Sequence, residues 1–135
     1  MENNLKLIDL FNSSNNNSIK WKKYFSVYEK LFKKYKNKKI TFVEIGVLDG
    51  GSLEIWKKYF GTESRIIGID NNPECKKFEN KDYEIHIGSQ SDPIFWKNFF
   101  NKIGNVDIML DDGGHTNDQQ IITLAESIKF INDDG

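Results

Sequence analysis

Cysteine is nearly absent from this sequence, in which Cys75 is the only one among 135 residues. A single cysteine excludes an internal disulfide and a cysteine-based metal cluster. Long apolar runs are also missing, since no segment approaches the roughly 20 residues of a transmembrane helix. The N-terminal segment MENNLKLIDLF lacks the basic stretch and following apolar stretch of a signal peptide. We therefore expect a cytoplasmic protein, of a length that suits one domain.

An excess of charge of one sign is missing as well. Charged residues make up 29% of the chain, yet the net formal charge is −1. Such a balance gives no general attraction toward nucleic acid or an anionic membrane, and neither is expected as a partner. Hydrophobic residues contribute 38% and aromatic residues 13%, which is enough to build a core rich in phenylalanine.

Residues 1–38 are predicted to form an N-terminal helical segment. Leu5–Phe11 is interpreted as a short helix and Asn12–Ser18, of sequence NSSNNNS, as a flexible connector. The lysines that follow are interpreted as a solvated helix face, and a lid or partner helix near the site is the alternative. Apolar residues recur between them at the spacing of one amphipathic helix face: Trp21, Tyr24, Phe25, Tyr28, Leu31, Phe32 and Tyr35.

Residues 39–135 are predicted to form an α/β domain with a Rossmann-like, doubly wound parallel sheet. Short apolar runs alternate there with helical stretches, which is typical of βαβ units. Such strands are buried on both faces and apolar almost throughout. The runs are Ile40–Ile45, Arg65–Ile69, Tyr83–Ile87 and Val106–Leu110, and helices are expected near Ser52–Phe60, Pro73–Asn80, Asp92–Lys102 and Asn117–Ile131.

The final residues, FINDDG, have the pattern of an approach to another strand. About four strands form only part of a doubly wound sheet. We therefore expect the natural chain to continue past Gly135.

A glycine-rich turn, EIGVLDGGS at residues 44–52, follows the first predicted strand. In open α/β sheets ligands bind outside the carboxyl ends of the strands. Gly46 and Gly50 allow a tight turn and close approach of a ligand to the backbone, and Ser52 is predicted to N-cap the next helix. Because the fingerprint G-x-G-x-x-G is missing, a ligand without a pyrophosphate fits better than a dinucleotide. A plain turn that needs glycine for its geometry is the alternative.

Asp70 and Asn71 stand at the end of the second strand. An acidic residue at this place can accept hydrogen bonds from both hydroxyls of a ribose, and an exposed or helix-capping aspartate is the alternative. Ser89 and Gln90 follow the third strand and are expected to face an adenine ring. Asp92 has a structural role instead, as the N-cap of the next helix.

The fourth strand ends in DDGGH, residues 111–115. Two adjacent carboxylates are costly to place together without a cation or donors, and only one of Asp111 and Asp112 is expected to face the ligand. Carboxylate oxygens suit Mg²⁺ or Mn²⁺. Histidine exchanges protons near neutral pH, which suits His115 to act as a general base toward a substrate hydroxyl. A helix N-cap cluster with His115 on the surface is the alternative.

These motifs together resemble class I S-adenosylmethionine-dependent methyltransferases. EIGVLDGGS and IGID (67–70) look like the first two motifs of that superfamily. GSQSD (88–92) and LDDGGH (110–115) are similar to the metal-dependent sugar O-methyltransferases of the macrocin and mycinamicin type, and the related cephalosporin hydroxylase group shares much of the pattern. The resemblance covers about residues 40 to 132. Gly114 departs from relatives that carry serine at its place.

The resemblance implies a role for each motif. Glu44, Gly46 and the following loop, with Gly50 and Ser52, would hold the methionine part of the cofactor. Asp112 would ligate Mg²⁺, with a remaining ligand from a later acidic motif absent from this sequence. His115 would be the base that removes the proton of an acceptor hydroxyl. The cofactor-binding set is completed by Asp70 and Asn71 at the ribose, Ser89 and Gln90 near the adenine, and Asp111.

The sequence thus predicts an O-methyltransferase that acts on a sugar or other small-molecule acceptor, with S-adenosylmethionine and Mg²⁺ as cofactors. A homo-oligomer is compatible with it. The alternatives are a non-catalytic cofactor-binding or scaffold fragment, and a nucleotide-sugar or NAD oxidoreductase of related fold. The missing G-x-G-x-x-G counts against the oxidoreductase, and the DDGGH cluster counts against the scaffold.

Overall fold

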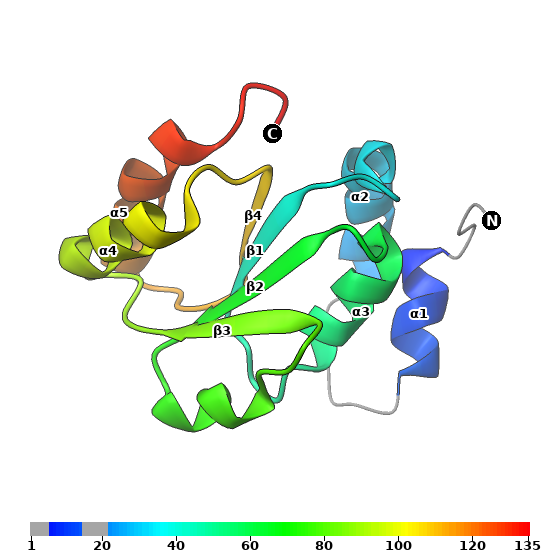
Figure 1. Cartoon of the computed structure of the whole chain (residues 1–135), viewed down its shortest axis with the longest axis horizontal. Helices are drawn as coiled ribbons and strands as arrows, with labels where there is room; N and C mark the ends of the chain where they lie inside the picture. Colours follow the sequence, from blue (N-terminus) through cyan, green and yellow to red (C-terminus); the bar gives the residue numbers. More distant parts are fainter. Residues whose placement is uncertain (1–5, 15–21) are drawn as a thin grey trace.

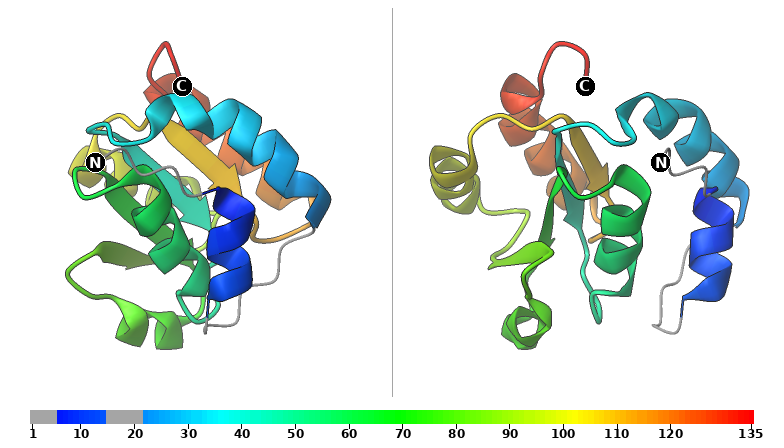
Figure 2. Two further views of the ribbon diagram at one scale, coloured as in Figure 1. Left: turned by 90° about the vertical axis from the view of Figure 1, so that its right-hand side faces the viewer. Right: turned by 45° about the vertical axis from the view of Figure 1, so that its right-hand side comes forward.

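A four-stranded sheet lies between two layers of helices in the computed structural model, which describes residues 6–14 and 22–135 (Figure 1). The strands are all parallel and follow the order β3-β2-β1-β4. This arrangement confirms the predicted α/β fold with a partial doubly wound sheet. Figure 2 shows α1 and α2 beside α3 on one face of the sheet, and α4 and α5 on the other.

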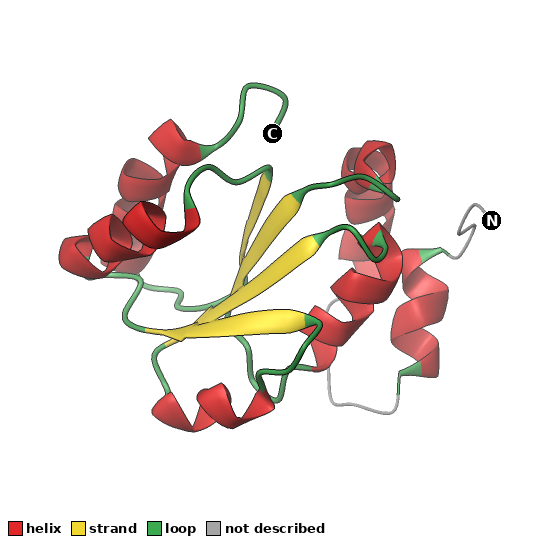
Figure 3. Ribbon diagram, in the orientation of Figure 1, coloured by secondary structure: helices red, strands yellow, loops and turns green. Residues whose placement is uncertain are grey.

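The strands occupy the predicted apolar runs, with small shifts at their ends (Figure 3). The fourth strand begins later than predicted because Asp107 interrupts the ladder. Its carboxylate accepts a hydrogen bond from the backbone N–H of Thr41 at 2.8 Å, while Val106 pairs with Ile131 instead. The strands are β1 (Thr41–Ile45), β2 (Arg65–Asp70), β3 (Tyr83–Ile87) and β4 (Ile108–Asp111).

Alternating side chains of the strands supply two separate cores. Phe42 and Ile66 point to the layer of α1, α2 and α3, where Trp56 is fully buried. Val43 and Ile67 point to the opposite layer, under α4. This alternation follows from the period of two in a strand, and it explains why the strands are apolar on both faces.

Helices follow each strand, as predicted, but two of them are shorter. The segment after β2 is a 3-10 helix, since Glu79 leaves it to accept a hydrogen bond from the N–H of Ile85 in β3 at 2.8 Å. The last helix ends early because Phe130 turns back to stack on Phe100, with ring centroids 4.2 Å apart. The helices are α3 (Gly51–Phe60), η2 (Pro73–Phe78), α4 (Pro93–Ile103), α5 (Asn117–Ser127) and η3 (Ile128–Phe130).

The N-terminal segment forms α1 (Leu7–Ser13), α2 (Lys22–Phe32) and the 3-10 helix η1 (Lys33–Tyr35). The short helix runs two residues past its predicted end, and the rest of the expected connector lies mostly outside the described residues, as does Trp21. Phe25 and Phe32 are buried against the sheet layer as expected. Tyr24 and Leu31, however, are 50% and 53% exposed. The apolar face of α2 is therefore only partly covered by the rest of the protein.

Within residues 6–14 and 22–135, none of the helices has the length and apolar character needed to cross a membrane.

Candidate cofactor and active site

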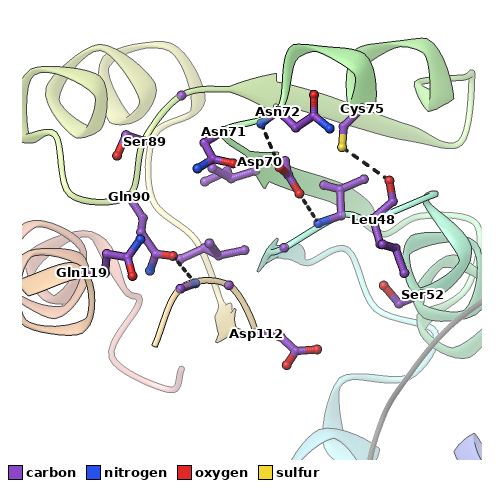
Figure 4. A pocket seen from close by; sticks show the side chains of 17 residues that line it. Leu48, Ser52, Asp70, Asn71, Asn72, Cys75, Ser89, Gln90, Asp112 and Gln119 are labelled. Atoms are coloured by element: carbon purple, nitrogen blue, oxygen red, sulfur yellow. Dashed lines mark hydrogen bonds between the residues drawn. The ribbon is translucent and has the colours of Figure 1, made fainter. Parts of the chain in front are cut away.

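A cavity of about 550 Å³ opens at the carboxyl ends of the four strands (Figure 4). It lies where the strand order reverses, since β1 continues along the chain to β2 on one side but pairs with β4 on the other. Such switch points are the usual ligand sites of open α/β sheets. Seven of the predicted site residues line it: Gly46, Ser52, Asp70, Asn71, Ser89, Gln90 and Asp112.

The glycine turn after β1 brings two loops into direct contact. Gly46 has φ +96°, and a Cβ added there would lie 2.4 Å from the carbonyl oxygen of Asp112. The N–H of Asp112 also donates to the carbonyl of Ile45 at 3.0 Å. Glycine at position 46 is therefore required by the approach of the Asp112 loop as well as by its own backbone conformation.

Ser52 does not cap helix α3, and this part of the sequence interpretation is wrong. The N-cap is Gly50, in the left-handed conformation at φ +82°, and Gly50 lies outside the cavity wall. The hydroxyl of Ser52 instead donates to the carboxylate of Glu44. Because the turn reaches the helix two residues earlier than expected, Ser52 lies in its first turn rather than before it.

Glu44 lies beneath the cavity and does not line it. Its side chain is fully buried, and its carboxylate also accepts a hydrogen bond from the indole N–H of Trp56 at 2.8 Å. A buried carboxylate is tolerated only where donors satisfy it. Glu44 thus ties β1 to helix α3, which carries Ser52 at the cavity wall.

Asp70 at the end of β2 orders the loops around it. Its Oδ2 accepts from the N–H of Val47 at 2.9 Å and its Oδ1 from the N–H of Asn72 at 2.9 Å. Each carboxylate oxygen can accept two hydrogen bonds, so one acceptor position on each oxygen is not used by these two bonds. Asn71 is exposed at the cavity rim, next along the chain.

Cys75 closes this side of the cavity. Its thiol donates to the carbonyl of Leu48 at 3.4 Å, and only 4% of the residue is exposed. Burial raises the pKa of the Cys75 thiol, and the nearby charge of Asp70 raises it further. The thiol is therefore held in its protonated, unreactive form.

Gln90 is buried under the cavity rather than turned freely into it. Its side-chain amide donates to Asp111 Oδ2 and to Thr123 Oγ1, both at 3.0 Å, and its Oε1 accepts from the N–H of Gly114 at 2.6 Å. Ser89 is half-buried, and its hydroxyl shares a hydrogen bond with that of Ser91 at 2.8 Å. Both Ser89 and Gln90 line the cavity, and Gln90 in addition joins the loops after β3 and β4.

The DDGGH loop divides its side chains between two environments. Asp112 is exposed and lines the cavity. Asp111 accepts bonds from Gln90 and from the N–H of Gly113, and it lies outside the cavity wall. His115 is exposed and also lies outside the wall. Among the described residues no group of three or more histidine, cysteine or acidic side chains gathers as a metal site.

Two solved methyltransferase-fold structures similar to this chain contain SAH or S-adenosylmethionine. MycE methyltransferase from the mycinamycin biosynthetic pathway, solved with Mg, SAH and mycinamycin VI, superposes with a TM-score of 0.86 at 24% identity, over 97% of this chain and 36% of that chain. Aeropyrum pernix fibrillarin, solved with S-adenosylmethionine, superposes with a TM-score of 0.61 at 18% identity, over 75% and 44%. The chain has the fold of the class I methyltransferases. The resemblance predicted from the sequence is confirmed.

Curated relatives with detectable sequence similarity are sugar O-methyltransferases. The chain is 30% identical over 119 residues to 8-demethyl-8-alpha-L-rhamnosyl tetracenomycin-C 2'-O-methyltransferase of Streptomyces olivaceus, covering 83% of this chain and 31% of that protein. It is 33% identical over 97 residues to mycinamicin VI 2''-O-methyltransferase of Micromonospora griseorubida, covering 67% and 24%. The chain thus spans about a quarter to a third of the length of these methyltransferases. No protein-family model matches it.

The methyltransferase fold also places residues in the cavity wall that sequence analysis did not select. Gln119 and Leu48 are the clearest examples. Gln119 forms a capping box with Thr116, whose hydroxyl accepts from the N–H of Gln119 at 3.3 Å. The sequence T-x-x-Q before an apolar stretch is a readable signal for this motif. No pattern in the sequence marks Leu48 as a wall residue.

Proposed function

We propose that the protein acts as an S-adenosylmethionine-dependent O-methyltransferase on a hydroxyl of a sugar or another small natural product. The observation that carries this proposal is the cavity at the switch point, where Asp70 presents its carboxylate at the end of β2. The similarity to sugar O-methyltransferases supports the reaction class. Since the chain covers only part of those proteins, the transfer of their activity to this chain is itself part of the proposal.

The cavity fits the cofactor in size and chemistry. Its volume of about 550 Å³ falls within the roughly 300–1,000 Å³ typical of small-molecule sites. Asp70 would accept both ribose hydroxyls while it keeps its two backbone donors. Ser89 would lie near the adenine, and the loop that begins at Gly46 would hold the methionine part.

Mg²⁺ fits the described residues only in part. Asp112 offers one exposed carboxylate at the cavity, whereas two hydrogen bonds already occupy the carboxylate of Asp111. Mg²⁺ often binds through one or two carboxylates and retains several waters. We therefore assign Asp112 as the ligand that this chain contributes, with water and acceptor hydroxyls among the other ligands. Bound there, Mg²⁺ would orient the acceptor and lower the pKa of its hydroxyl.

His115 would act on the acceptor rather than on the cofactor. It follows the Asp112 loop on the same edge of the sheet, and it is exposed. We assign His115 as the general base that takes the proton from the acceptor hydroxyl, an effect typically worth about 10²–10⁴-fold in rate. The cofactor supplies the methyl group on its sulfonium. Asp70 would hold the ribose, and the loop that begins at Gly46 would hold the methionine part. Together they would fix the position of the methyl group between those two parts.

Calorimetric titration with S-adenosylmethionine tests the proposal, with NADH as the competing ligand. Asp70→Asn should weaken binding of S-adenosylmethionine about ten-fold, since it replaces one acceptor oxygen and removes the charge. Asp107→Asn is the matched control, because Asp107 also accepts a backbone hydrogen bond but lies at the opposite end of the sheet. A wild-type chain that prefers NADH, or an Asp70→Asn variant that binds as tightly as Asp107→Asn, would contradict the proposal.

A further inference from the structure

Both neighbours of His115 in the chain contact the side-chain amide of Gln119. After His115, the N–H and the hydroxyl of Thr116 donate to Oε1 of Gln119 at 3.1 and 2.9 Å. Before His115, Gly114 lies against the same amide, because a Cβ added to Gly114 would overlap with Oε1, Cδ and Nε2 of Gln119. One side chain therefore fixes the backbone on both sides of the proposed general base.

Glycine at position 114 is explained by this contact and not by its backbone conformation. The φ of Gly114 is not positive, so a residue with a Cβ could adopt it. The space next to its Cα, however, is taken by the amide of Gln119. This amide cannot give way cheaply, because the two hydrogen bonds from Thr116 hold its Oε1 in place. Position 114 therefore lacks a side chain because Gln119 uses the space that a side chain would need.

The imidazole of His115 has no hydrogen bond of its own in the described part of the chain. It is also exposed, so neither packing nor a polar partner sets its direction. Its position therefore depends on the backbone of the loop that carries it. Position matters strongly for a general base, since a displacement of about 1 Å can lower a rate on the order of 10²-fold.

Gln90 holds the same loop at a different atom. Its Oε1 accepts from the N–H of Gly114 at 2.6 Å. Gln90 and Gln119 both line the cavity, and Figure 4 shows them on the same side of it. The bond to Gln90 fixes Gly114, whereas Gln119 also reaches Thr116. Of the two glutamines, Gln119 is the one whose contacts span the residue that carries the imidazole.

We propose that Gln119 is a positioning residue for His115: its amide clamps Gly114 and Thr116, so that the imidazole meets the acceptor hydroxyl in a fixed position. This inference rests on the proposed function, in which His115 takes the proton of that hydroxyl. Helix α5 anchors the clamp, because Thr116 is both the N-cap of the helix and the residue that follows His115. The clamp therefore joins the loop of the base to a rigid element through one side chain.

Relaxation of the backbone amides, measured by NMR, reports the order of His115 in the wild-type chain and its variants. The wild type should give an order parameter of about 0.85 at His115, and Gln119→Ala should lower it below about 0.6. Gln119→Glu should keep the wild-type value, because a carboxylate can accept the same two hydrogen bonds from Thr116. Gln120→Ala is the matched control, since Gln120 is the next residue of helix α5 and is exposed. Equal order parameters at His115 in the wild type and Gln119→Ala would overturn the inference.

Thr116→Val separates the clamp from a purely structural role of the helix cap. The variant loses the hydroxyl that accepts from the N–H of Gln119 at 3.3 Å, so its helix should be less stable. It keeps the backbone N–H that donates to Oε1 of Gln119, so the order parameter at His115 should stay near the wild-type value. A fall as large as that in Gln119→Ala would show that His115 follows the stability of the helix alone, and it would overturn the inference.

A double-mutant cycle tests whether Gly114 and Gln119 share one space. Gly114→Ala should lower the urea midpoint of the wild type, because the new methyl group displaces the amide from Thr116. In the Gln119→Ala background the same change should leave the midpoint equal or raise it, since the space is then empty and alanine restricts the unfolded chain. Equal losses in the two backgrounds would contradict the shared space and, with it, the clamp.

Titration of the wild-type chain with S-adenosylmethionine separates failure of this inference from failure of the proposed function. Absence of binding would contradict the function, and with it the assignment of His115 as a base. Binding by the wild type, together with an unchanged order parameter at His115 in Gln119→Ala, would overturn the clamp alone.

Discussion

The side-chain amide of Gln90 donates a hydrogen bond to Oδ2 of Asp111, 3.0 Å away, and so joins the loop after β3 to the end of β4. Its other bonds, to Thr123 and Gly114, extend this link to helix α5 and to the DDGGH loop. A single buried glutamine therefore fixes the loop that carries Asp112 relative to the rest of the cavity. This role is structural, although Gln90 also belongs to the wall of the site.

Gln90→Ala should lower the free energy of unfolding by about 2 kcal/mol, because it leaves the buried hydroxyl of Thr123 and the half-buried N–H of Gly114 without these hydrogen bonds. Urea denaturation followed by tryptophan fluorescence measures the change. Gln120→Ala is the control, since Gln120 is exposed on helix α5 and its substitution should cost less than about 0.5 kcal/mol. Equal stability of the two variants would show that the network of Gln90 contributes nothing.

Gly46→Ala should be more destabilising than Gly104→Ala, although both glycines have positive φ. A methyl group at Gly104 meets no atom within 4 Å, so the substitution costs only the conformational penalty, about 1–3 kcal/mol. A methyl group at Gly46 would in addition lie 2.4 Å from the carbonyl oxygen of Asp112, which cannot move cheaply. Overpacking of this kind adds about 1–3 kcal/mol. Chemical denaturation of both variants decides the order, and equal costs would refute the close contact.

His86 should make the protein less stable as the pH falls from 7.5 to 5.5. Burial lowers the pKa of His86, and the neighbouring Glu84 offsets this only in part. The unfolded chain therefore takes up a proton near the ordinary value of about 6.5 while the folded chain does not, so acidification favours unfolding. The loss continues until the pH falls below the folded pKa.

His86→Gln should flatten this dependence of the unfolding free energy on pH. Glu79 does not interfere, because a backbone hydrogen bond from Ile85 lowers its pKa from an ordinary value that already lies below this pH range. Denaturation curves at several pH values for both proteins give the two slopes. Identical slopes would assign the pH dependence to other groups.

His115→Ala should lower kcat for methyl transfer to a sugar acceptor by about 10²–10⁴-fold if His115 is the general base. Its affinity for S-adenosylmethionine should not change, because His115 lies outside the cavity wall. His86→Gln is a matched control for loss of a histidine, since His86 lies within strand β3 and is not a wall residue. A parallel loss of cofactor affinity in His115→Ala would point to collapse of the loop instead.

Sequence analysis predicted the strands and their parallel arrangement because the apolar runs are buried on both faces and leave few alternatives. Seven of the residues that it predicted for the site line the cavity, since parallel strands bring Gly46, Asp70 and Asp112 to one edge. It did not predict the hydrogen-bond partners of individual side chains. Ser52 and Gln90 have residue types that suit a ligand, but the structure bonds Ser52 to Glu44 and Gln90 to Asp111. Those choices depend on distances between segments, which no local pattern contains.

The cavity takes its wall from the ends of all four strands, at Gly46, Asp70, Gly88 and Asp112. The site therefore does not exist until every strand has joined the sheet, and a molecule held there binds only the assembled protein. By mass action, a ligand at one hundred times its dissociation constant would stabilise the folded state by about 2.7 kcal/mol. In the cell, a higher concentration of the ligand would then raise the folded fraction of the protein and lower its rate of proteolysis.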